Sequence, residues 1–148
     1  MSIKPLNLPE RLRDKALVVK INDDGKSFSS SGGKWEVSGF VTAKIREFGN
    51  YSVSVDTIPP KISPVQPETF KNLAGQKKIK FIINDELSGI ASYRGTLNGK
   101  WILMEYDAKN DLLFYTIDER LQAGENPFSL EVTDGKGNRK IYSAKFVR

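Results

Sequence analysis

The segment Asp56-Thr57-Ile58-Pro59-Pro60 decides how this chain is organised. Proline holds the backbone angle φ at about −65° and favours extended geometry in the residue before it, so this segment predicts a stiff, extended link. Short stretches of alternating apolar and polar residues lie on both sides of the link. We therefore predict an all-β protein, with a smaller β segment over residues 1–55 and a β-sandwich over residues 56–148.

The residues before the link predict three or four short strands. A strand is expected over residues 16–21, ended by the turn at 22–25. The Ser- and Gly-rich stretch 27–33 predicts a loop, residues 35–45 predict a second strand, and residues 51–55 predict a third. So small a sheet is marginal in water, so we expect this segment to pack on the rest of the chain or to be part of a larger β domain.

The residues after the link alternate more regularly. We predict six strands, over residues 79–84, 90–97, 100–106, 112–117, 127–133 and 139–147. Asn98-Gly99 is a strong hairpin signal because both residues tolerate positive φ. Residues 118–124 carry a capping aspartate and a terminal glycine, which predict one short helical turn. Strands at this spacing, with no long amphipathic helix among them, favour a sandwich.

Composition excludes several classes of function. The 148 residues include no histidine and no cysteine. The usual serine, cysteine and zinc hydrolase mechanisms need one of these residues, so we assign no catalytic residues and predict that the chain is not an enzyme. No apolar run approaches the roughly 20 residues of a membrane-spanning helix, and the amino terminus lacks the apolar core of a secretory signal. We predict no membrane span and no signal peptide in this chain.

The charge pattern argues against nucleic-acid binding. The net charge is +5 and the isoelectric point is about 9.4, but basic and acidic residues are mixed along the chain. Lys77, Lys78 and Lys80 form the only cluster of basic residues, and their place at the solvent-exposed start of a predicted strand explains it. Without a basic stripe, we predict no nucleic-acid partner.

Four oxygen-bearing residues are candidates for a calcium site. Asp85, Glu86, Asp134 and Asn138 each follow a predicted strand, so they can meet at one end of the sandwich. Calcium prefers oxygen ligands, but these residues match no EF-hand loop, and they also favour tight turns for conformational reasons. Calcium is therefore the one ion that these residues suggest, and no other cofactor or metal is expected.

The aromatic residues are candidates for sugar stacking. Trp35 lies beside the Ser- and Gly-rich stretch and Tyr93 lies within a predicted strand, so we take these two as possible ligand-stacking residues. Trp101 alternates with Leu103 on one strand face, which favours a place in the core. Glu105 and Asp107 have a spacing that a glycosidase pair tolerates, but nothing in the sequence supplies a cleft.

Several motifs together resemble known families. The link at 56–60, Asn84-Asp85-Glu86-Leu87-Ser88-Gly89-Ile90, and Glu131-Val132-Thr133-Asp134 with Gly137-Asn138 resemble bacterial immunoglobulin-like repeats. Gly33-Lys34-Trp35, Arg46-Glu47-Phe48-Gly49, the run from Trp101 to Asp107, and Leu113-Phe114-Tyr115 resemble the carboxy-terminal extension of lysostaphin-type (LytM-like) murein endopeptidases from Bacteroidetes. This second resemblance extends over most of the chain from about Ser29.

The resemblance implies an immunoglobulin-like β-sandwich with an accessory role. Peptidases of that family hold zinc through His and Asp in a separate domain, and none of those positions exists in this chain. The implied function is a non-catalytic module of a bacterial cell-envelope protein, periplasmic or surface-exposed, that positions a murein peptidase. Its expected partners are cell-wall glycan, another protein or its own upstream domain. An independent adhesin or carbohydrate-binding module is the alternative.

Overall fold

A computed structural model describes residues 1–65 and 72–148. The described residues form four antiparallel sheets and one short 3₁₀ helix, η1 (Glu10–Lys15), which confirms the all-β prediction. The chain separates into two compact units. The first unit comprises Met1–Ile58 with Glu86–Ser88 and Gly135–Gly137, and the second comprises Pro59–Asp85, Gly89–Asp134 and Asn138–Arg148. Within the described ranges, no helix has the length and apolarity to cross a bilayer.

The first unit contains two three-stranded sheets. One has the order β3 (Phe28–Gly32), β2 (Ala16–Ile21) and β6 (Asn50–Val55), and the other has the order β1 (Ser2–Ile3), β5 (Val41–Thr42) and β4 (Lys34–Trp35). A small apolar cluster is buried within the unit. Its buried members are Ala16, Val18, Val41 and Ala43, and half-buried side chains that include Tyr51, Val53 and Val55 pack against them.

Two predictions for the first unit are wrong. Residues 27–33 are not a loop, because β3 pairs with the central strand β2 through its backbone, which needs no apolar side chains. Residues 35–45 are not one strand. The Glu36 amide donates to the Phe40 carbonyl and Gly39 adopts a φ of 87°, so a tight turn interrupts the strand and leaves Val37 exposed.

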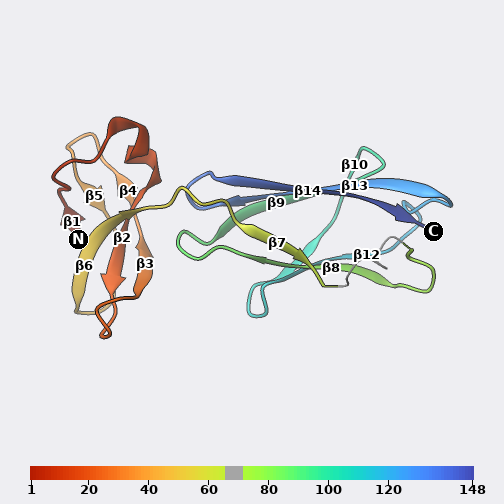
Figure 1. The fold of residues 1–148 in the computed structure, drawn as a ribbon, viewed down its shortest axis with the longest axis horizontal. Coiled ribbons are helices and arrows are strands. Elements are labelled where there is room, and N and C mark those ends of the chain that lie inside the picture. Colours follow the sequence, from red (N-terminus) through yellow and green to blue (C-terminus); the bar gives the residue numbers. More distant parts are fainter. Residues whose placement is uncertain (66–71) are drawn as a thin grey trace. The chain divides into compact units, whose positions relative to one another are not determined.

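The second unit is a sandwich of two four-stranded sheets (Figure 1). One sheet has the order β10 (Lys100–Ile102), β9 (Ile90–Leu97), β13 (Glu125–Asp134) and β14 (Arg139–Val147). The other has the order β11 (Glu105–Asp107), β12 (Leu112–Thr116), β8 (Lys78–Asn84) and β7 (Lys61–Pro64). The predicted strands over 79–84, 90–97, 127–133 and 139–147 are confirmed within these bounds.

The core of the second unit lies between its two sheets. Every second residue of β8, β12 and β13 is buried, as the alternation predicts. The inward side chains include Ile79, Phe81 and Ile83 of β8, Leu113 and Tyr115 of β12, Phe128, Leu130 and Val132 of β13, and Phe146 of β14. The rings of Phe81 and Phe128 stack with their centroids 5.4 Å apart, so aromatic contacts join the two sheets.

The hairpin prediction in the second unit is confirmed, whereas two others are wrong. Asn98 and Gly99 have φ values of 52° and 75°, as a two-residue hairpin requires. Residues 100–106 are not one strand, because the chain leaves the first sheet after Ile102 and enters the second at Glu105. Residues 118–124 form a turn rather than a helical segment, closed by a hydrogen bond from the Leu121 amide to the Asp118 carbonyl.

Tyr115 fastens this turn to the core. Its side chain is only 2% exposed, and its hydroxyl donates a hydrogen bond to the Asp118 carboxylate, which also accepts one from the Arg120 guanidinium. Burial raises the pKa of Tyr115 to about 12, and the hydrogen bond to Asp118 adds to this effect. The phenol is therefore neutral wherever the unit is folded at ordinary pH.

This shift predicts a loss of stability in strong base. The pKa of Tyr115 is higher in the folded chain than in the unfolded chain. The neutral phenol therefore stabilises the folded chain fully below the unfolded pKa of about 10. This stabilisation is lost as the pH rises toward 12. We expect the free energy of unfolding of the unmodified chain to fall more steeply above pH 10 than that of Tyr115→Phe. Urea unfolding of both chains from pH 8 to 12 measures this difference, and parallel curves would contradict it.

Candidate binding site

The outer face of one sheet in the second unit carries a row of polar side chains. Residues paired across neighbouring strands point to the same side of a sheet. The register pairs Trp101 with Thr96, Thr96 with Ser129, and Ser129 with Ser143, so these four residues form one row across β10, β9, β13 and β14. Their chain neighbours Leu97 and Phe128 point the other way, into the core. The row therefore lies on the face directed away from the core.

This row borders a shallow hollow of about 510 Å³, which we call the hydroxyl hollow. Its lining consists of Thr96, Gly99, Pro127, Phe128, Ser129, Ser143, Ala144 and Lys145. Within the part of the chain that the structure describes, the hydroxyls of Thr96, Ser129 and Ser143 have no hydrogen-bond partner. Three groups able both to donate and to accept are thus available to a ligand.

Trp101 is exposed beside the hydroxyl hollow, so its predicted place in the core is wrong. Its side chain is 56% exposed and that of Leu103 is 64% exposed, whereas Ile102 between them is buried. Trp101 also lines a second hollow of about 340 Å³, together with Tyr93, Leu103 and Met104 among others. An exposed indole next to free hydroxyls offers the apolar surface and the polar groups that a sugar ring needs.

The sequence contains a signal that places Trp101 outside. A two-residue loop at Asn98-Gly99 pairs Leu97 with Lys100 and therefore Thr96 with Trp101. Since Leu97 points inward, its neighbour Thr96 and the paired Trp101 must point outward. Alternation along residues 100–106 alone does not decide between the two faces, because Trp101 and Leu103 are as apolar as Ile102 and Met104.

The two predicted stacking residues have other contacts in the structure. Trp35 is half-buried against the cluster of the first unit, and the Arg13 guanidinium lies 4.9 Å from the centre of its ring. Tyr93 packs at the edge of the second unit's core, with its ring edge-on to Tyr106 at 5.7 Å. Both rings are partly covered, although Tyr93 also lines the hollow beside Trp101. Ligand stacking by either residue stays a prediction.

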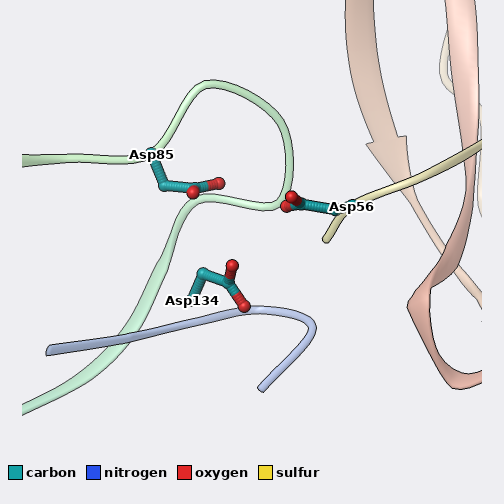
Figure 2. Close-up of side chains that lie close together, drawn as sticks. All are labelled: Asp56, Asp85 and Asp134. Carbon is teal, nitrogen blue, oxygen red and sulfur yellow. The ribbon is translucent and has the colours of Figure 1, made fainter. Parts of the chain in front are cut away.

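The calcium candidates of the second unit lie where two strands end: Asp85 follows β8, Asp134 ends β13, and Asn138 lies in the turn after β13. Asp85 and Asp134 each offer a carboxylate oxygen, and these atoms lie within 4.8 Å of one another (Figure 2). The Asp134 carboxylate accepts hydrogen bonds from the Asn138 amide at 2.8 Å and from Asn138 Nδ2 at 2.7 Å, and Asp85 accepts one from the Gly89 amide at 2.9 Å. These bonds account for the acids as turn-forming residues. Calcium binding stays a prediction.

Glu86, the remaining calcium candidate, belongs to the segment 86–88 of the first unit.

The buried acid of that unit is Asp56, which the sequence analysis did not single out as a site residue. Its carboxylate accepts hydrogen bonds from the amides of Ile58 at 3.2 Å and Ser88 at 3.0 Å. Asp56 therefore orders the start of the link and holds segment 86–88 within the first unit.

Glu105 and Asp107 lie on β11, a short strand at the edge of its sheet. Glu105 is exposed, and Asp107 accepts hydrogen bonds from the Lys109 amide at 3.2 Å and from Asn110 Nδ2 at 2.7 Å. Asp107 thus shapes the turn that leads into β12.

Comparison with known proteins gives a family match for part of the chain. Residues 1–56 match the model of the Zu5-like domain. The matched region comprises most of the first unit and ends where the link begins. No curated protein matches the chain. The first unit is therefore similar to Zu5-like domains.

Proposed function

We propose that this chain is a non-catalytic accessory module of a bacterial cell-envelope protein, and that it binds cell-wall glycan through the second unit. The observation that carries this proposal is the exposed Trp101 beside the hydroxyl hollow. A rigid aromatic surface with polar groups next to it is a common way to hold a polar ring. The composition agrees, since histidine and cysteine are missing from the sequence.

The proposed kind of fold is immunoglobulin-like. If β7 to β14 are given the letters A, B, C, C′, D, E, F and G, one sheet has the order A-B-E-D and the other has the order G-F-C-C′. These are the strand orders of immunoglobulin-type sandwiches. The sheet order thus supports the resemblance to bacterial immunoglobulin-like repeats. The resemblance to the extension of murein endopeptidases is the ground for placing the chain in the envelope.

Binding of this kind would act through position alone. A module that holds a peptidase on its polymer raises the effective concentration of substrate around the catalytic domain. The gain depends on the link between domains and on the affinity of the module, and it needs no reacting group in the module itself. The exposed, shallow character of the hydroxyl hollow suits a polymer that must be held and released.

Retention on purified peptidoglycan sacculi tests this function. We expect the unmodified chain to sediment with sacculi, and Trp101→Ala to weaken retention about tenfold or more, as for a central aromatic contact. Phe48→Ala is the matched control, because Phe48 is fully exposed in the first unit. It should leave retention unchanged, and melting curves should report both variants as folded. Equal retention of Trp101→Ala and the unmodified chain would contradict the proposal.

A further inference from the structure

The charged side chains on the outer face narrow down the kind of glycan. Arg139 pairs with Glu131 at 3.6 Å and Lys145 pairs with Glu125 at 3.3 Å. Glu131 is two residues from Ser129 on β13 and so points to the outer face. Arg94 is exposed on the same face, since the register pairs it with Glu131. Among the residues that the structure describes, no carboxylate forms an ion pair with Arg94. Of the three basic residues described on this face, Arg94 is therefore the one that forms no ion pair, although Glu131 is its cross-strand neighbour.

Arg94 is close enough to serve the same ligand as the hydroxyl hollow. It is two residues from Thr96 on β9, so the two Cα atoms are about 6.6–6.8 Å apart along the strand. The row from Trp101 to Ser143 crosses three strand spacings, about 14 Å in all. This length suits an extended chain of sugars rather than a single ring, and it allows one sugar to reach both the row and Arg94.

We propose that the hydroxyl hollow binds a linear glycan that carries carboxylate groups. One sugar ring stacks on Trp101, the hydroxyls of Thr96, Ser129 and Ser143 exchange hydrogen bonds with the sugar hydroxyls, and Arg94 holds a carboxylate. A guanidinium binds a carboxylate through two parallel hydrogen bonds, which makes this contact selective. This inference rests on the proposed glycan binding and adds the charge of the ligand.

Titration calorimetry with two matched oligosaccharides tests the inference. The probes are β-1,4-linked tetramannuronate and β-1,4-linked mannotetraose, which share their length and linkage and differ in the carboxylates. We expect the acidic probe to bind the full chain about tenfold more tightly, because a hydrogen bond to a charged group contributes more than a neutral one. Arg94→Gln should remove this preference. Arg46→Gln, which removes one exposed charge from the first unit, should keep it.

A second pair of variants tests the place of binding. Ser129→Tyr fills the hydroxyl hollow on a central strand where tyrosine is well tolerated, so it should abolish binding of both probes. Thr116→Tyr makes the same change at an exposed position of the other sheet and should have no effect. Equal affinity for the two probes, a preference that survives Arg94→Gln, or no binding of either probe would overturn the inference. Sacculi retention that depends on Trp101 would still support the proposed function in each case.

Discussion

Replacing Phe81 with alanine should lower the free energy of unfolding by about 3–5 kcal/mol, the range for large aromatic residues in a core. The Phe81 side chain is 0% exposed, and its ring lies 5.4 Å from that of Phe128 and 5.3 Å from that of Tyr142. Alanine removes both contacts and leaves a cavity between the two sheets. Such a loss is a large part of the 5–15 kcal/mol that stabilises a typical domain.

Urea unfolding of the full chain, followed by circular dichroism, measures this loss. Phe48→Ala is again the control, because the Phe48 side chain is fully exposed and its removal should change stability by less than about 0.5 kcal/mol. A cost below about 1 kcal/mol for Phe81→Ala would mean that the two sheets do not share the aromatic core described above.

Replacing Asn126 with aspartate should lower the free energy of unfolding by about 3 kcal/mol at neutral pH, although the two side chains have nearly the same shape. Asn126 is 0% exposed. Its Nδ2 donates to the carbonyls of Gln122 at 2.8 Å and Gly124 at 3.0 Å, and its Oδ1 accepts from the Gln122 amide at 2.8 Å. Aspartate loses both donors and places a charge in a buried site against two carbonyl oxygens.

The matched control for this change is Asn110→Asp. Asn110 is exposed, and its side chain donates one hydrogen bond to Asp107. We expect the free energy of unfolding to fall by about 1 kcal/mol or less there, since water solvates the new carboxylate and screens its repulsion from Asp107. Urea unfolding at pH 7 compares the two variants. If Asn126→Asp and Asn110→Asp lower the free energy of unfolding equally, the side-chain amide of Asn126 does not hold the turn over residues 118–124.

Burial explains which parts of the fold the sequence predicts. Ile79, Phe81 and Ile83 must avoid water together, so alternation alone identifies β8 and its inner face. β3 has no such signal, because its serines and glycine pair through backbone groups with β2. The change of sheet between Ile102 and Glu105 is also hidden, since a strand that crosses between layers keeps the same alternation as a straight one.

The proposed binding face could be predicted only in part. Thr96, Ser129 and Ser143 are far apart in the sequence and meet only through the register of three strands. The hairpin at Asn98-Gly99 is local in the sequence. Its register pairs Trp101 with Thr96 and so predicts that Trp101 points outward. The sequence alone does not single out Arg94. Arg94 differs from Arg139 and Lys145 only because these two form ion pairs with Glu131 and Glu125, and those pairs depend on the register of the strands.

The two tryptophans provide the most direct test of glycan binding by the second unit. The chain contains only Trp35 and Trp101, one in each unit, so its indole N–H groups give two separate NMR signals. We titrate the ¹⁵N-labelled chain with soluble peptidoglycan fragments and assign the signals with Trp101→Phe. Glycan binding on the outer face predicts that the Trp101 signal moves in a saturable way while the Trp35 signal stays in place. Movement of Trp35 alone, or of neither signal, would contradict it.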